Sequence, residues 1–200
     1  MRKARVILAH GWLGHHYELA PIGDALESAG FEVKHVKLYT LFGRFEAAVD
    51  AVLEAVLAQP NRRVHLIGFS FGGLVMRAVA DRCPSRIESL LLIGVPNTGS
   101  PFADLLSIIF PTSAVRRLAR AAPSLPEPPL GLRVGCIAGT RKGLLGLFLR
   151  RPNDSRVTAA SAFAIPHDFE ATVHCKHEVL RGHPEVIRHA VAFVERSTGC

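Results

Sequence analysis

The pentapeptide Gly-Phe-Ser-Phe-Gly at residues 68–72 contains the side chain best placed to do chemistry, the hydroxyl of Ser70. It follows a β-type run over 63–69 and opens a helix-type run over 72–80. A nucleophile elbow needs this context of strand, turn and helix, because a sharp turn lifts the serine oxygen towards a base and a substrate. A Cβ at Gly68 or Gly72 would clash with neighbouring backbone in such a turn. Ser70 is therefore the predicted nucleophile.

The elements that would position this serine alternate between β-type and helix-type patterns. Strands are expected at 6–10, 31–38, 63–69, 87–95, 132–138 and 169–174, mostly as continuous apolar runs. Helices are expected at 17–29, 45–58, 72–82 and 184–195. This alternation predicts a parallel sheet with helices on both faces, formed by a single α/β domain over residues 1–200.

One stretch, residues 100–131, breaks the alternation. It begins with an apolar helix-like run at 102–110 and ends in a proline-rich run at 122–130. We expect a cap-like helical insertion after the fourth strand, lying over the C-terminal edge of the sheet.

Five segments carry a family resemblance that spans almost the whole chain. They are Ala-His-Gly-Trp-Leu-Gly at 9–14, the pentapeptide above, Gly-Val-Pro-Asn-Thr-Gly-Ser-Pro at 94–101, Pro-Asn-Asp-Ser-Arg-Val at 152–157, and His-x-x-Leu at 177–180. With them the chain resembles the α/β-hydrolase family, in particular its compact bacterial lipases and esterases. The resemblance implies a three-layer sandwich whose mainly parallel six-stranded sheet has the order 2-1-3-4-5-6, with the family's first two strands missing before Val6.

Acyl transfer needs backbone N–H groups that face the oxygen which becomes negative in the tetrahedral intermediate. The resemblance assigns these oxyanion-hole donors to Trp12, the residue after His-Gly, and to Phe71, the residue after the nucleophile. The alternative for His10-Gly11 is an ordinary turn after a strand.

The same resemblance implies a triad in the chain order serine, acid, histidine. His177 matches the His-x-x-Leu pattern and is the expected base, because an imidazole can take and return a proton near neutral pH. His174, expected at the end of the last strand, is the next candidate, and His183 is expected to cap the last helix.

Asp154 is the expected acid, since its segment resembles the family's Asp-Gly-x-Val, with Ser155 in place of the glycine. A carboxylate there can hold the imidazole tautomer. Asp168 and Glu170 compete but fall at the wrong end of the last strand. Asp104, in the insertion, could line the pocket. Three further aspartates are expected to be solvated on helices: Asp24, Asp50 and Asp81.

Composition narrows the function classes. The formal charge is +7, but the basic residues are scattered and form no stripe interleaved with aromatic residues, which argues against nucleic-acid binding. No run approaches the roughly 18 apolar residues that span a bilayer. The four cysteines show no C-x-x-C spacing, which favours free thiols in the cytoplasm over disulfides or a zinc site.

Two aliphatic segments could form the roof of a site for an acyl chain: the insertion with Phe102 and Leu106, and the run with Leu144, Leu147 and Phe148. The alternative is that both simply pack onto the sheet. The sequence thus predicts a serine hydrolase that cleaves carboxylic esters, with an apolar acyl group, without metal or cofactor, and with at most transient contact with a lipid surface. A thioesterase and a non-catalytic binding protein with the same fold are the alternatives.

Overall fold

The computed structural model describes residues 4–58, 62–143 and 152–198. Its core is a six-stranded sheet with the order β2-β1-β3-β4-β5-β6, in which all five neighbouring pairs are parallel. The strands are β1 (Arg5–Ala9), β2 (Glu32–Val36), β3 (Val64–Phe69), β4 (Ile87–Ile93), β5 (Arg133–Gly139) and β6 (Phe169–Val173). The predicted order and fold class are confirmed, and strand bounds differ from those expected by up to two residues.

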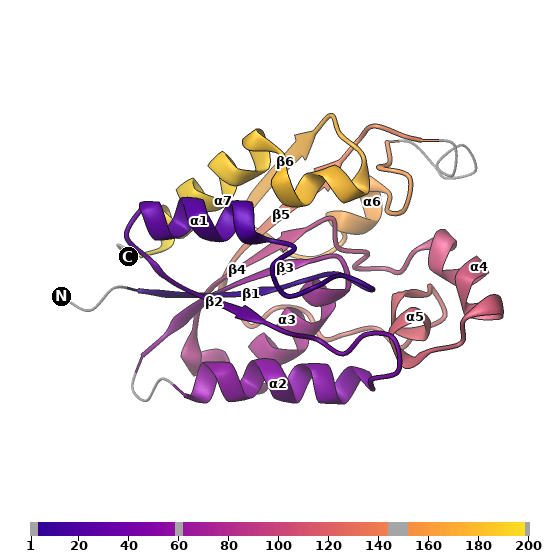
Figure 1. Cartoon of the computed structure of the whole chain (residues 1–200), viewed down its shortest axis with the longest axis horizontal. Coiled ribbons are helices and arrows are strands. Elements are labelled where there is room, and N and C mark those ends of the chain that lie inside the picture. Colours follow the sequence, from indigo (N-terminus) through magenta and orange to yellow (C-terminus); the bar gives the residue numbers. More distant parts are fainter. Residues whose placement is uncertain (1–3, 59–61, 144–151, 199–200) are drawn as a thin grey trace.

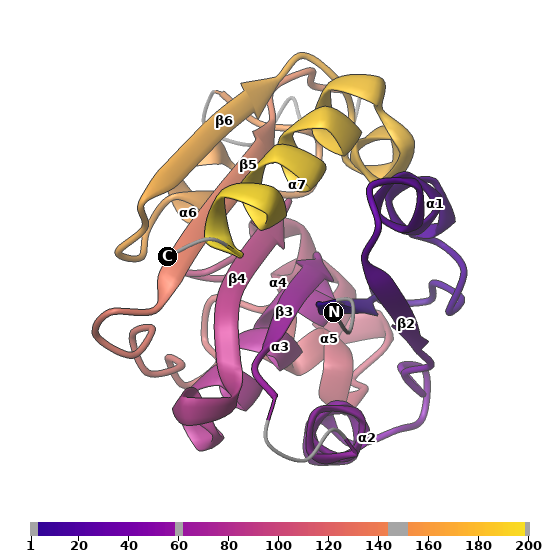
Figure 2. The ribbon, with the colours of Figure 1, turned by 90° about the vertical axis from the view of Figure 1, so that its left-hand side faces the viewer.

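Helices cover both faces of the sheet (Figures 1 and 2). On one face lie α1 (Ala20–Ser28) and α7 (Pro184–Ser197), and on the other α2 (Phe45–Leu57) and α3 (Phe71–Arg82). Alternate residues of a strand point to opposite faces, so Val6 and Leu8 pack with α1 and α7 whereas Ile7 and Ala9 pack with α2 and α3. This alternation produces the three layers.

The edge strands differ from the expectation of burial on both faces. Strand β6 alternates between half-buried and exposed residues until Val173, and β2 is only partly buried until Val36. An edge strand has a neighbour on one side only, so the flanking helices cover it less completely than the central strands, and β3 is buried throughout.

Residues 100–131, where an insertion was expected, contain two helices, α4 (Pro101–Ile109) and α5 (Ser113–Leu118). The second helix was not predicted; its signal is Thr112, whose hydroxyl caps it by accepting a hydrogen bond from the N–H of Val115 at 3.3 Å. Both helices lie at the end of the sheet where the parallel strands terminate (Figure 1). The described residues also contain three short elements: η1 (Pro84–Arg86), α6 (Ala159–Ala162) and η3 (His177–Gly182).

Candidate active site

The register of the sheet brings the loop after β1 beside Ser70. Ala9 pairs with Gly68, and Phe69 pairs with Ile93, so β1, β3 and β4 end at the same level. The N–H of Ser70 extends this pairing by donating to the carbonyl of Ile93 at 2.9 Å. The segment that begins at His10 therefore leaves the sheet next to the serine.

Ser70 adopts a left-handed backbone conformation, with φ 51° and ψ −118°. Non-glycine residues rarely adopt such a φ, and the strain persists only where the surrounding structure enforces it. A Cβ at Gly68 would lie 2.5 Å from the Cα of Gly73, and one at Gly72 would collide with the carbonyl of Ala9. The tight turn between β3 and α3 thus requires both glycines.

His177 and Asp154 form a buried pair. Nδ1 of His177 lies 2.7 Å from Oδ2 of Asp154, and the side chains are 3% and 1% exposed. The carboxylate can only accept here, so Nδ1 carries the proton and Nε2 is free to act as a base. The ring also packs on Phe69, with ring centroids 4.9 Å apart. The sequence placed His177 in a loop, whereas it begins the short 3-10 helix η3, a common form of connector.

The other oxygen of Asp154 is bound by its own turn. Oδ1 accepts hydrogen bonds from the N–H groups of Arg156 at 3.0 Å and Val157 at 2.8 Å. Ser155 has φ 90°, a conformation that favours glycine, so the serine occupies it at a cost in strain. The side chain of Asn153 supports the turn by accepting from the N–H of Ser155 at 3.0 Å.

The two predicted oxyanion donors flank the serine. Phe71 is the first residue of α3, so its N–H has no acceptor within the helix. The N–H of Trp12 forms no hydrogen bond within the part of the chain that the structure describes. Its neighbours do: Gly11 donates to Glu18 at 3.0 Å and Leu13 to the hydroxyl of Thr40 at 3.0 Å.

His10 supports the loop of Trp12 through two hydrogen bonds of its imidazole. Its Nε2 accepts from the N–H of Leu38 at 2.9 Å, so its Nδ1 must carry the proton that it donates to the carbonyl of Gly11 at 2.8 Å. Burial lowers the pKa of the imidazole and keeps it neutral, as this bonding pattern requires. The supporting roles of His10, Glu18 and Thr40 were not predicted.

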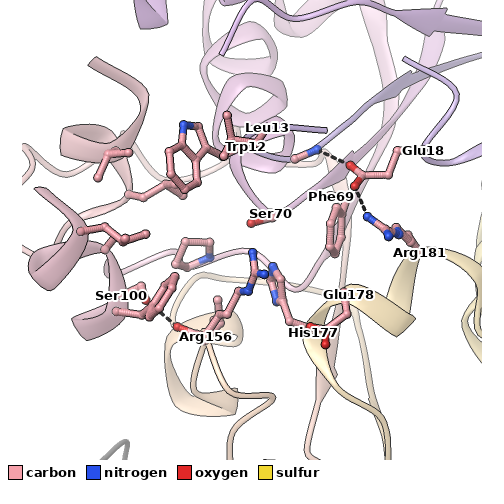
Figure 3. A pocket seen from close by; sticks show the side chains of 18 residues that line it. Trp12, Leu13, Glu18, Phe69, Ser70, Ser100, Arg156, His177, Glu178 and Arg181 are labelled. Atoms are coloured by element: carbon pink, nitrogen blue, oxygen red, sulfur yellow. Dashed lines mark hydrogen bonds and ion pairs between the residues drawn. The ribbon is translucent and has the colours of Figure 1, made fainter. Parts of the chain in front are cut away.

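A cavity of about 370 Å³ opens over Ser70 and His177 (Figure 3). Trp12 and Leu13 lie on one side of Ser70, and Arg156 and His177 on the other. Phe102 and Leu106 of α4 line the cavity, as expected from the sequence. Val115 and Leu118 of α5 line it as well. Leu144, Leu147 and Phe148 lie outside the described residues.

The alternative candidates lie elsewhere. His174 is exposed and 3.4 Å from the hydroxyl of Thr140, and His183 caps α7. Asp168 accepts from the N–H of Val134, Glu170 pairs with His167, and Asp104 pairs with Arg120 and does not line the cavity.

Cys175 is buried two residues before His177. Burial raises the pKa of its thiol to about 11, so it does not compete as a nucleophile at neutral pH. Within 4–58, 62–143 and 152–198, no cluster of three or more His, Cys, Asp or Glu residues has the arrangement of a metal site.

The family model for palmitoyl protein thioesterase matches residues 5–120, more than half of the chain. The chain belongs to this family. Two triacylglycerol lipases are among the proteins that this chain is similar to. One from Pseudarthrobacter phenanthrenivorans is 39% identical over 70 residues, which cover 35% of this chain and 22% of the lipase. One from Pseudomonas fragi is 34% identical over 115 residues, 52% of this chain and 39% of the lipase. The chain thus matches between a fifth and two fifths of the length of these lipases.

Solved structures support the fold. The mature lipase BlEst2 of Bacillus licheniformis superposes with a TM-score of 0.76 at 19% identity, covering 96% of this chain and 92% of that one. The metagenomic carboxyl esterase MGS0156 also gives 0.76, at 18% identity, covering 99% and 77%. At such low identities the likeness shows the α/β-hydrolase fold alone.

Proposed function

We propose that this chain is a serine hydrolase that cleaves carboxylic esters through an acyl-enzyme. The observation that carries the proposal is the buried 2.7 Å contact between Asp154 and His177, because His177 lines the same cavity as the strained Ser70. A serine hydroxyl is a weak nucleophile unless a base removes its proton, and an oriented imidazole is the usual base.

The proposed reaction has two halves. In the first, Nε2 of His177 accepts the proton of Ser70 while Oγ attacks the carbonyl carbon, and the N–H groups of Trp12 and Phe71 stabilise the oxyanion. His177 then gives the proton to the alcohol oxygen, which leaves. In the second half, His177 activates water to release the acid. Asp154 stays ionised and stabilises the imidazolium. No metal or cofactor takes part.

The acyl chain is proposed to lie against the insertion, residues 100–131, which acts as a cap. Phe102 and Leu106 give this side of the cavity an apolar wall. We propose that Leu144, Leu147 and Phe148 of the protein also contact the acyl chain. Leu105, Ile108 and Ile109 of α4 are 61%, 78% and 64% exposed, which suits transient contact with a lipid surface.

Hydrolysis of thioesters is the second candidate, and the description of the matching family favours it. The same serine, base and oxyanion donors would act on a thioester. Parallel assays of an oxygen ester and a thioester with the same acyl chain distinguish the two.

In the described part of the chain no helix is long and apolar enough to cross a bilayer. Cys83, Cys136 and Cys175 carry free thiols, in keeping with the cytoplasmic location expected from the sequence, which stays a prediction.

Labelling with a fluorophosphonate probe, located by mass spectrometry, tests the proposal. We expect the label on Ser70, and no hydrolysis of a short p-nitrophenyl ester by a folded Ser70→Ala protein. Labelling at another residue, or wild-type turnover by Ser70→Ala, would discard the assignment. A folded wild-type protein that neither reacts nor turns over would instead be a binding protein with this fold.

A further inference from the structure

Arg156 lines the cavity over Ser70 without an acidic partner. All 17 acidic side chains of the sequence lie in the described residues, and none of them forms an ion pair with its guanidinium. Within residues 4–58, 62–143 and 152–198, the guanidinium contacts the ring of Phe102, whose centroid lies 5.7 Å away. Arg181, the other arginine of the cavity, is paired with Glu18. Arg156 is therefore the unpaired cation of the described cavity wall.

The position of this arginine is fixed by the catalytic turn itself. Its N–H donates to Oδ1 of Asp154, and its carbonyl accepts from the hydroxyl of Ser100 (Figure 3). Arg156 also stands at the variable position of the Asp-Gly-x-Val segment that the chain resembles. A half-buried cation beside an apolar wall loses hydration and gains most from an anion that pairs with it.

The geometry indicates which part of a substrate would meet the guanidinium. The base must reach the leaving oxygen to return the proton, so the alcohol part of an ester lies on the side of His177. Arg156 lies on this side of Ser70, and Trp12 lies on the opposite side (Figure 3). Phe102 contacts the guanidinium, so the remaining apolar lining, Leu106 of α4 with Val115 and Leu118 of α5, is left for the acyl chain.

We propose that Arg156 binds an anionic group, a carboxylate or a phosphate, on the alcohol part of the substrate. The preferred substrates are then anionic amphiphiles with an apolar acyl chain. This inference rests on the proposed function and deepens it. Arginine suits the role because its planar fork binds two oxygens at once and keeps its charge. Glu178 also lines the cavity, but it is exposed, so solvent screens its repulsion of the anion.

Matched butyrate esters test the proposal by kinetics. Two carry an anion on the alcohol part, 4-(butyryloxy)benzoate and 4-(butyryloxy)phenyl phosphate, and 4-(butyryloxy)benzamide is the neutral reference. We expect Arg156→Met to lower the anionic-to-neutral ratio of kcat/KM by roughly 10- to 100-fold, the range for a hydrogen-bonded charge pair. Arg156→Lys should lower this ratio less than Arg156→Met does, because lysine keeps the positive charge. Arg188→Met removes an exposed arginine of α7 and should leave it unchanged.

The two anionic esters distinguish a carboxylate site from a phosphate site. A second pair, p-nitrophenyl hemisuccinate and its neutral succinamate, carries the charge on the acyl part and should respond little to Arg156→Met. An effect confined to this pair would overturn the assignment to the alcohol part. A ratio that Arg156→Met leaves unchanged for every pair would overturn the site.

Binding to the Ser70→Ala protein tests the site without catalysis. Trp12 is the single tryptophan and lines the cavity, so its fluorescence reports occupancy. We expect Arg156→Met to weaken the binding of octyl phosphate by tenfold or more and to affect the binding of octyl glucoside much less. Equal losses for the two ligands would refute the anion site. If instead no ester is cleaved and no probe labels Ser70, the proposed function fails while this titration still decides the site.

Discussion

Glu18 joins the loop of Trp12 to the helix that bears His177. One carboxylate oxygen accepts the N–H of Gly11 at 3.0 Å, and the other pairs with Arg181 of η3 (Figure 3). The Glu18 side chain is only 6% exposed and that of Arg181 is 43% exposed, so solvent screens the pair in part. The loop of Trp12 and the helix of the proposed base are thus held by one carboxylate, in addition to the sheet.

Replacing Glu18 by Ala should therefore lower kcat by roughly 10- to 100-fold with a smaller effect on KM, because the loop and the base lose their common support. Steady-state kinetics on a short ester measure this. Glu46→Ala, which removes a surface ion pair with Arg82, is the matched control and should keep wild-type kcat. Equal kcat values for Glu18→Ala and wild type would show that the sheet alone positions both groups.

The choice of base gives a second prediction. His177→Ala should lose several orders of magnitude in kcat, since it removes the proposed proton acceptor of Ser70. His174→Ala and His183→Ala should lose much less, because one side chain is exposed beside Thr140 and the other caps α7. Circular dichroism establishes that each variant is folded. A larger loss in His174→Ala than in His177→Ala would move the base to His174.

Local patterns explain why so much of the fold could be predicted. Buried parallel strands such as β3 are continuous apolar runs. The turn at Ser70 is indicated by Gly68 and Gly72, because a Cβ at either position would clash. The family resemblance then supplied the strand order. The ion pair of Glu18 with Arg181 joins residues 163 positions apart and leaves no local pattern. The turn at Ser155 could not be predicted either, because the type of a non-glycine residue does not reveal a strained φ.

A third prediction concerns the pH dependence of stability. Burial lowers the pKa of His65 to about 4 from 6.5, with the charge of Arg63 as a smaller cause. Between these values the unfolded chain binds a proton that the folded chain does not, so stability is lost as the pH falls. His65 should account for a loss of about 2 kcal/mol in the free energy of unfolding between pH 7.5 and pH 5.

Urea unfolding at the two pH values measures this loss. In His65→Gln the stability should fall by that much less, because the amide does not titrate in this range, whatever the variant's stability at pH 7.5. A pH dependence of the same size in His65→Gln and wild type would assign the acid sensitivity to other groups.

The last prediction concerns the acyl chain. Each buried methylene contributes about 0.8 kcal/mol, so two more carbons should raise kcat/KM roughly tenfold until the cavity is full. Leu106→Asp should flatten this dependence while sparing acetate esters, because its charge would lie where the longer chain binds. Leu105→Asp is the matched control: it changes the neighbouring residue of α4, which is 61% exposed and outside the cavity lining, and should keep the dependence. Phe148→Asp should act like Leu106→Asp if the run around Leu147 contacts the acyl chain. A profile that Leu106→Asp leaves unchanged would mean that α4 only packs on the sheet, and that the acyl chain binds against another wall.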